Sequence, residues 1–261
     1  VIKSDGDLTY FACDMAYHRN KFERGFTKMV NIWGADHHGY VGRLKAAIEA
    51  MGYDARLLQV ILVQLVQLTR GGNPVRMGKR SGEFVTLKEV VEEVGTDAAR
   101  FFFLMRRSDS HLDFDLDLAK TNSSENPVFY VQYAHARVAS IFEQANSHGI
   151  KTKGLKASGA ELEKLSLAEE LDLIKKVIQF GSVVKDSVEE LEPHRLVFYL
   201  LELAGLFHSY YNRCRVISED LALTRARLVL VQEVQKVIGK GLGLLGVSAP
   251  MKMARIESEG K

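Results

Sequence analysis

Two short polar clusters hold side chains of the kinds that bind and activate phosphates. The first, Gly34–Tyr40, reads GADHHGY and combines an acid, two imidazoles and a phenol. The second, Arg76–Gly82, reads RMGKRSG and sets Lys79 and Arg80 on a glycine-rich turn, where the backbone can approach a ligand closely. Because a predicted helix and strand separate the two clusters, we expect them to form two walls of a nucleotide pocket.

Each cluster also has a simpler interpretation. His37 and His38 are either a metal-binding pair or ordinary surface histidines. Since no Cys lies near them and Asp36 is the one other ligand type close by, we predict no metal site. Lys79 and Arg80 would also fit a solvated basic turn, although such a turn does not require the glycines that crowd around them.

Two helical spacings supply further candidate binding residues. Tyr10 and Asp14 share a face of a predicted helix, where a carboxylate can pair bidentately with a guanidinium. The alternative is an amphipathic helix with a half-buried Tyr and a solvated Asp. Tyr130, Tyr133 and Arg137 share another helical face, whose rings could stack on unpaired bases. Aromatic side chains of a core explain this second face equally well.

The elements that must hold these residues alternate between helix and strand before about residue 118. Apolar residues over Val41–Met51 recur at helical spacing and stop before Gly52. The run Leu57–Val66 has the composition of a buried parallel strand, although its length also permits a helix. Asp36 and His37 then fall where a strand feeds into a helix, which is the usual ligand site of a doubly wound α/β sheet.

The chain after about residue 125 is predicted to be helical throughout. Pro127 suits the first turn of a helix that runs to about Ser147. Capping boxes mark helix starts at Thr86 with Glu89 and at Ser166 with Glu169, and the latter helix is expected to continue almost to Pro193. The last two helices are expected over His194–Cys214 and Leu221–Leu245. We therefore predict an α/β part over residues 1–117 and an α-helical bundle over residues 118–261.

Composition narrows the setting in which the protein works. Of its 261 residues, 46% are hydrophobic and 26% are charged, which suffices for one large core or two moderate ones. No apolar run approaches the ~20 residues that span a membrane, and the Val1 end lacks the order of a secretory signal. Cys13 and Cys214 are too few for a zinc framework, so we expect reduced thiols in a cytoplasmic protein. The net charge of +2 neither requires nor excludes nucleic acid.

These motifs resemble those of the arginyl-tRNA synthetases, a family of class I aminoacyl-tRNA synthetases. The segment RMGKRSG is similar to the KMSKS loop of that class. Arg76 stands in place of the first Lys of the motif and Gly78 in place of its Ser, while Lys79 matches the second Lys. The collinear blocks that carry the resemblance are SDGDLTYFACDMAYH, GADHHGY, RMGKRSGEFVTL, DAARFFFL and LDFDLDLA. It continues through ENPVFYVQYAHARVASI to about Met253.

The resemblance implies a fold and an activity. The fold would be the second half of a class I Rossmann-like catalytic domain, followed by a helical anticodon-binding domain of the DALR type. The activity would be to activate arginine with ATP and Mg²⁺ and to transfer it to arginine tRNA, as a monomer in the full-length enzyme. No HIGH-type motif occurs in the sequence. We therefore expect a C-terminal portion of such an enzyme, inactive by itself.

The resemblance also implies roles for particular residues. Those implied in catalysis are Lys79, Arg80 and His37. Those implied in arginine binding are Tyr10, Asp14 and His37. Those implied in ATP binding are Gly34, Asp36, Arg76, Met77 and Lys79. Those implied in tRNA binding are Tyr130, Tyr133 and Arg137, with Tyr210, Tyr211 and Met253 as further candidates.

Two alternatives stay open at this point. A relative of the cysteinyl-tRNA synthetases would have a related helical domain, but the zinc-binding cysteines of that family are absent here. A non-catalytic helical RNA-binding protein with a decayed nucleotide fold would explain the substitutions at Arg76 and Gly78. Separate binding assays with ATP and tRNA would distinguish these alternatives.

Overall fold

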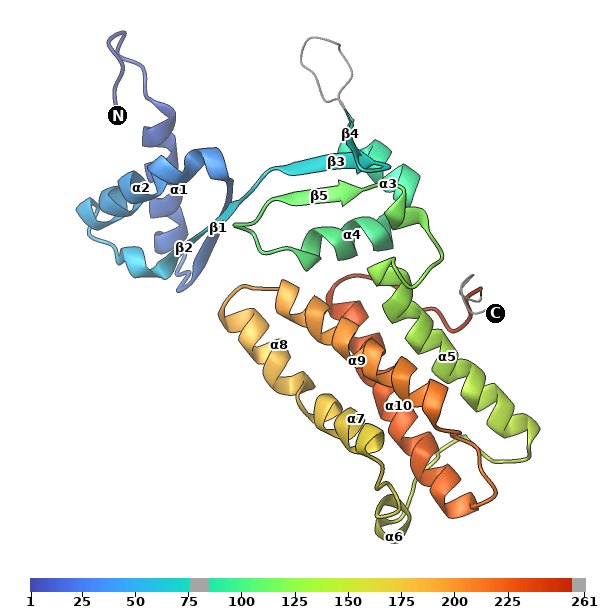
Figure 1. Ribbon diagram of the computed structural model, residues 1–261. Helices are drawn as coiled ribbons and strands as arrows, with labels where there is room; N and C mark the ends of the chain where they lie inside the picture. The colour runs from blue at the N-terminus through green and yellow to red at the C-terminus, as the bar shows by residue number, and fades with distance from the viewer. Residues whose placement is uncertain (76–84, 255–261) are drawn as a thin grey trace. The chain divides into compact units, whose positions relative to one another are not determined.

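The computed structural model describes residues 1–75 and 85–254 (Figure 1). Its internal contacts divide the chain into two compact units. The first comprises Val1–Gln67 with Ser108–Leu112, and the second comprises Leu68–Arg107 with Asp113–Lys261. The boundary expected between residues 117 and 118 separates two predicted functions, whereas these units are defined by contacts alone. That boundary therefore stays a prediction.

The first unit is built on two parallel strands. Its elements, in chain order, are α1 (Tyr10–Glu23), β1 (Met29–Gly34), η1 (Ala35–His37), α2 (His38–Ala50), η2 (Ala55–Leu57) and β2 (Leu58–Val63). Strands β1 and β2 pair from Met29 opposite Leu58 to Gly34 opposite Val63. The core of the unit is made by Met29, Leu44, Ile48, Ala55 and Leu58. This α/β pattern confirms the helix that was predicted to stop before Gly52, which has a φ of 84°.

The apolar run Leu57–Val66 differs in part from its prediction. It does form a parallel strand, β2, but the strand ends at Val63 and a second strand begins at Val66. Only Leu58 of β2 is fully buried, and Leu65 is 81% exposed. Two strands cover each other poorly, so the expectation of a fully buried strand was wrong for most of the run.

The second unit begins with a small sheet and two short helices. Its sheet has the order β4-β3-β5, made by β3 (Val66–Arg70), β4 (Asn73–Pro74) and β5 (Leu112–Asp115). Helices α3 (Leu87–Val94) and α4 (Thr96–Met105) follow the hairpin. The capping box predicted for Thr86 and Glu89 is confirmed, and Gly95 separates the helices with a φ of 84°.

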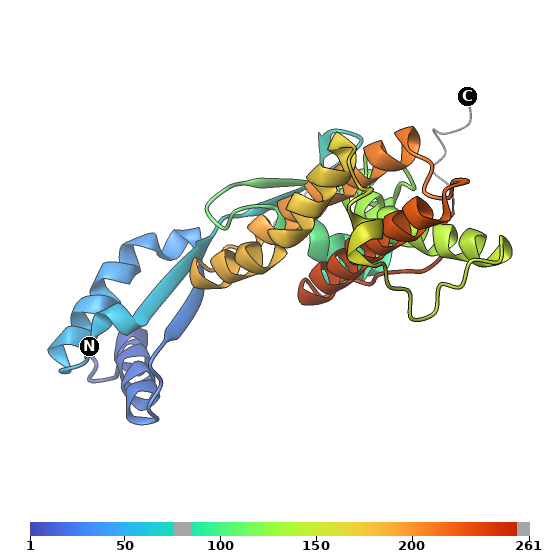
Figure 2. The same cartoon turned by 90° about the horizontal axis from the view of Figure 1, so that it is seen from below.

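A helical bundle completes the second unit. Its members are α5 (Pro127–Ser147), α6 (Gly159–Leu162), α7 (Ala168–Ile178), α8 (Phe180–Glu189), α9 (His194–Arg213) and α10 (Leu221–Leu244). Helices α5, α9 and α10 pack along one another (Figures 1 and 2) and bury large side chains such as Leu200, Phe207 and Leu228. Helix α4 also packs on α5 and α9, so it belongs to the same core. No helix in the described ranges has the length and hydropathy to cross a membrane.

One predicted helix start was wrong. Helix α7 begins after Leu167, whose backbone amide donates to Glu170 Oε2 at 3.0 Å, so Ser166 and Glu169 form no capping box. The other oxygen of Glu170 accepts from Arg227 at 2.7 Å, and the Glu170 side chain is fully buried. Because Arg227 holds it in the core, Glu170 caps the start of α7 in place of the predicted Glu169. The single helix expected up to Pro193 is in fact α7 and α8, which meet at Gln179.

Candidate functional site

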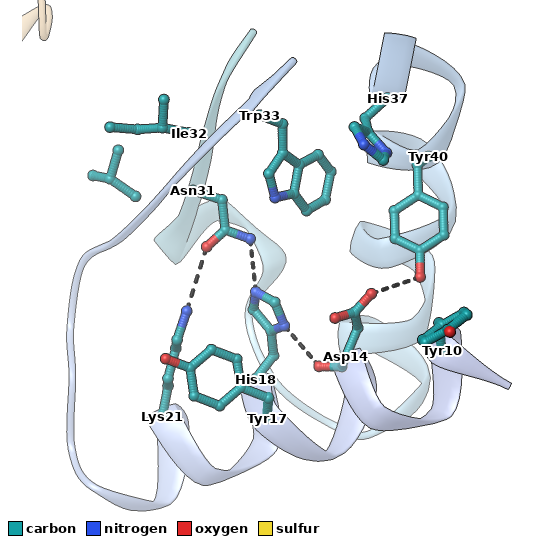
Figure 3. Close-up of a pocket in the computed structure, with 11 residues that line it drawn as sticks. Tyr10, Asp14, Tyr17, His18, Lys21, Asn31, Ile32, Trp33, His37 and Tyr40 are labelled. Atoms are coloured by element: carbon teal, nitrogen blue, oxygen red, sulfur yellow. Dashed lines mark hydrogen bonds between the residues drawn. The ribbon is translucent and has the colours of Figure 1, made fainter. Parts of the chain in front are cut away.

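A pocket of about 540 Å³ lies in the first unit beside α1 and β1 (Figure 3). Two of its sides come from one face of α1 and from β1, and a third comes from η1 and the start of α2. The residues that line it are Tyr10, Asp14, Tyr17, His18, Lys21, Val30, Asn31, Ile32, Trp33, His37 and Tyr40. All three residues predicted to bind arginine, namely Tyr10, Asp14 and His37, are among them.

The carboxylate of Asp14 is fixed by a phenol from another helix. Helix α1 starts at Tyr10, so Asp14 lies one turn further along the same face, as the spacing predicted. Tyr40 of α2 donates its hydroxyl proton to Asp14 Oδ2 at 2.8 Å (Figure 3). Asp14 Oδ1 accepts from no other side chain in the described part of the chain. One oxygen therefore remains able to accept a donor from a ligand.

Tyr40 is suited to this supporting role. Burial disfavours its charged form, and together with the hydrogen bond to Asp14 it raises the pKa of Tyr40 to about 12. The phenol is therefore protonated at neutral pH and acts as a donor. Its ring packs edge-on against Phe11 of α1 and against Trp33 of β1, with centroid distances of 5.5 and 5.6 Å. Sequence reasoning missed Tyr40 as a site residue, although it belongs to the GADHHGY motif.

The turn from β1 into α2 carries Gly34 and Asp36, two of the residues predicted to bind ATP, together with His37. Asp36 and His37 lie on η1, directly after the end of β1, as expected from the sequence. Their side chains are 82% and 59% exposed, and His37 Nε2 lies 3.7 Å from Asp36 Oδ2. A Cβ on Gly34 would lie 2.5 Å from Asp36 Oδ1, so a larger residue would displace that carboxylate. The turn thus presents an exposed acid and imidazole beside the pocket.

Arg76, Met77, Lys79 and Arg80 lie outside the described residues, and their roles stay predictions. The β3–β4 hairpin precedes them and the capped start of α3 follows. Within residues 1–75 and 85–254, no three His, Cys, Asp or Glu side chains gather in the way that a metal site requires.

The second unit contains an aromatic cluster around Arg137 of α5. The guanidinium lies over the rings of Tyr133 and Tyr211, 4.6 and 4.7 Å from their centroids. It also donates to the Tyr133 hydroxyl at 3.3 Å and lies 3.2 Å from Nδ1 of His208. Nε2 of His208 donates to the carbonyl of Tyr130 at 3.2 Å, which leaves Nδ1 as the acceptor for Arg137. Tyr130, Tyr133 and Arg137 therefore form one assembly, as their spacing predicted.

Burial distinguishes the members of this cluster. Tyr133 and Arg137 are only 7% and 9% exposed. Most of their surface is therefore buried, as the alternative of a core aromatic face predicted. Tyr211, by contrast, is 38% exposed. Tyr210 is fully buried and separate from the cluster, so it is a core residue of α9. Their roles in tRNA binding stay predictions.

Met253 joins the same cluster through a fixed C-terminal segment. It packs against Phe129 and Tyr133. The segment before it is held by Ser248, whose amide donates to Asp97 Oδ1 at 3.1 Å and whose carbonyl accepts from Gln132 at 2.9 Å. The contact between His135 Nδ1 and the Pro250 carbonyl, at 2.9 Å, adds a further restraint. Sequence reasoning missed His208 and Asp97, because their partners Arg137 and Ser248 lie 71 and 151 residues away in the chain.

Comparisons with known proteins identify the relatives of both units. Residues 131–253, from α5 to the end of the fixed segment, match the family model of the DALR anticodon binding domain. An α/β unit together with a DALR domain fits the fold that the resemblance to the class I aminoacyl-tRNA synthetases implied. Within that class, the chain is a homologue of the arginine–tRNA ligases. These matches favour the arginine–tRNA ligases over the alternative of a cysteinyl-tRNA synthetase relative.

The similarity to arginine–tRNA ligases covers almost the whole chain. The ligase of Desulfitobacterium hafniense is 54% identical over 97% of this chain and 45% of its own length, and that of Syntrophotalea carbinolica is 56% identical with the same coverage. A solved Campylobacter jejuni structure, assigned as an arginyl-tRNA synthetase, is 37% identical with a TM-score of 0.88, over 97% of this chain and 54% of that one. The Thermus thermophilus arginyl-tRNA synthetase, 24% identical over 97% of this chain and 50% of its own, shares the fold with a TM-score of 0.76. The chain spans about half the length of these proteins.

Proposed function

We propose that this chain supplies arginine- and tRNA-binding sites to an arginine–tRNA ligase. The complete enzyme would join arginine to ATP as arginyl-adenylate, release pyrophosphate and then transfer arginine to its tRNA. The observation that carries the proposal is that similarity to arginine–tRNA ligases extends through both units, over 97% of the chain. We also infer that the full-length enzyme is a cytoplasmic monomer.

The pocket beside α1 would bind the arginine side chain. The free oxygen of Asp14 would accept the guanidinium, and the bond from Tyr40 would hold the carboxylate in place. Tyr10 is 90% exposed at the mouth of the pocket and would add a ring or hydroxyl contact. His37, on the side of the pocket formed by η1, would face the backbone of the amino acid.

The turn after β1 and the basic loop would bind ATP. Gly34 and Asp36 would bind the ribose of ATP. Arg76, Met77 and Lys79 would approach its phosphates. Lys79, assisted by Arg80 and His37, would stabilise charge that develops as the arginine carboxylate attacks the α-phosphate. Mg²⁺ would enter with the phosphates, since no set of three acidic or histidine ligands gathers among the described residues.

A substitution at Lys79 tests this catalytic role. Lys79→Ala in the complete ligase should lower kcat more than it raises the ATP KM, because the cation would act on charge that is present mainly in the transition state. Pyrophosphate exchange at varied ATP concentration measures both quantities. Weaker ATP binding with an unchanged kcat would instead make Lys79 an anchor for bound ATP.

The aromatic cluster would bind the anticodon loop of the tRNA. Tyr130, Tyr133 and Arg137, the residues assigned from the sequence, are joined there by Tyr211 and Met253. Tyr211 is more exposed than Tyr130 and Tyr133, so it would make the most direct stacking contact. Tyr133 and Arg137 would support the exposed ring of Tyr211 from its buried side.

An experiment with a chimera tests the proposal as a whole. The purified chain by itself should not charge arginine tRNA at a useful rate, because it has no HIGH-type motif. Joined to the remaining part of the D. hafniense ligase, it should restore charging with arginine, with the native D. hafniense enzyme as the positive control. A folded chimera that binds tRNA but neither ATP nor arginine would support the alternative of a non-catalytic RNA-binding protein.

A further inference from the structure

Three polar side chains join α1 to β1 in the inner part of the pocket (Figure 3). His18 is the one buried residue of α1, with 3% of its surface exposed. Its Nδ1 lies 2.7 Å from the carbonyl of Asp14, and its Nε2 lies 2.8 Å from the side-chain amide of Asn31 on β1. Asn31 Oδ1 in turn accepts from Lys21 Nζ at 3.4 Å. None of these three residues has a role in the proposed function so far.

The hydrogen bonds at the two ends of this chain fix the protonation of His18. A carbonyl can only accept, so Nδ1 of His18 must carry the proton that it donates to Asp14. An ammonium can only donate, so Lys21 requires the oxygen of Asn31 and turns the NH₂ group toward His18. Nε2 must then be an unprotonated acceptor. Both ends therefore specify the same state, the neutral Nδ1–H tautomer.

Aromatic contacts also hold helix α1 in the first unit. Phe22 stacks on Tyr53 with a centroid distance of 4.5 Å, and Phe11 packs edge-on against Tyr40. Phe22 also packs on the core cluster that includes Met29 of β1, and in the described residues the side-chain hydrogen bonds between α1 and β1 are those of His18 and Lys21 to Asn31. The other ring nitrogen of His18 donates to the carbonyl of Asp14, the residue whose carboxylate accepts from Tyr40. Rotation of α1 about its axis would move that carboxylate away from its partner.

We propose that His18, held as its neutral Nδ1–H tautomer by Asn31 and Lys21, is the positioning residue that sets the place of the Asp14 carboxylate for guanidinium recognition. The assignment of a guanidinium to Asp14 rests on the proposed function. A neutral His18 also leaves Lys21 as the one permanent cation among the residues that line the pocket. A second fixed cation beside Asp14 would oppose the binding of a positively charged side chain.

The tautomer can be measured directly on the 261-residue chain. Long-range ¹H–¹⁵N spectra of the chain with labelled histidine, assigned by the signal missing in His18→Gln, should show a protonated Nδ1 and an unprotonated Nε2. An Nε2–H tautomer or a doubly protonated ring would overturn the proposal. Asn31→Asp should convert His18 to the doubly protonated form, because a carboxylate only accepts.

Matched substitutions test the positioning role in the complete ligase. Glutamine can place a polar atom where His18 has Nε2 and so retain the bond to Asn31, whereas asparagine can replace only Nδ1. His18→Asn should raise the arginine KM about tenfold, with kcat and the ATP KM changed far less, because small displacements of a binding group cost affinity. His18→Gln should stay close to the parent. Asn31→Leu, which removes the partner of His18 Nε2, should behave like His18→Asn.

Two outcomes separate this inference from the proposed function. Equal arginine KM values for folded His18→Asn and His18→Gln would overturn the positioning role. An unchanged arginine KM in Asp14→Ala would instead overturn guanidinium binding by Asp14, while the ¹⁵N result on His18 would stand.

Discussion

Replacing Tyr133 with alanine is expected to lower the free energy of unfolding of the second unit by roughly 3–5 kcal/mol, the usual cost of truncating a buried aromatic residue. The ring is 7% exposed and stacks on Phe129 and beneath the Arg137 guanidinium. Urea unfolding of the chain, followed by circular dichroism, measures the loss. Tyr211→Ala is the matched control: its ring contacts the same guanidinium but is 38% exposed, so its cost should be about 1 kcal/mol or less.

This difference decides how tRNA binding should be tested. If Tyr211 stacks on a base, Tyr211→Ala should weaken binding of arginine tRNA by roughly 1–3 kcal/mol without changing the salt dependence, because stacking releases no counterion. Arg137→Ala should also leave the salt dependence unchanged, since its guanidinium is 9% exposed and enclosed by rings. A salt titration against a tRNA with an altered anticodon loop provides the control. A reduced salt slope for Arg137→Ala would show that it contacts phosphate.

The helices that the sequence predicted well are those with local signals at their ends. Helix α5 has the expected bounds, Pro127–Ser147, because a proline fits the first turn and apolar residues repeat along its whole length. Helices α9 and α10 each end one residue before the predicted limit. Ser166 failed as a cap for the opposite reason: the start of α7 depends on the ion pair of Glu170 with Arg227, which lie 57 residues apart.

The residues of the candidate sites also divide into those predicted by local spacing and those whose contacts depend on residues distant in the sequence. The shared face of Tyr10 and Asp14 was predictable, because it depends only on the period of one helix. The partner of Asp14, Tyr40, comes from a helix 26 residues later, so its contact depends on packing that no periodicity reveals. Likewise, the spacing of Tyr133 and Arg137 placed them together, but their burial results from His208 and Tyr211 on α9.

Packing also changes which fragment should be used to study the helical bundle. The bundle predicted over residues 118–261 suggests a fragment that starts at Leu118. Helix α4 lies before that boundary, yet Phe101 and Phe102 of α4 are almost fully buried and Asp97 binds Ser248. A fragment that starts at Leu118 would therefore lose core contacts and the anchor of the segment that carries Met253. A fragment that starts before α3 retains both.

The sharpest expected effect on substrate binding is at Asp14. In the complete ligase, Asp14→Ala should raise the arginine KM roughly 10- to 100-fold, because a charge-assisted hydrogen bond contributes roughly 1.5–3 kcal/mol. The pocket offers no second carboxylate among the residues that line it, so no neighbour can replace the lost partner of the guanidinium. The ATP KM should change little. Arginine-dependent pyrophosphate exchange in the presence of tRNA measures these constants.

Two controls show whether the charge of Asp14 is responsible. Tyr40→Phe keeps the carboxylate and its charge and removes only the 2.8 Å bond that orients it, so the arginine KM should rise by a smaller factor, roughly 2- to 10-fold. Citrulline, which has the shape of arginine without its charge, should compete with arginine poorly in the parent, and Asp14→Ala should lose most of that discrimination. If arginine and citrulline remain as well distinguished in Asp14→Ala as in the parent, another group recognises the guanidinium, and Asp14 is an ordinary polar residue on the exposed face of α1.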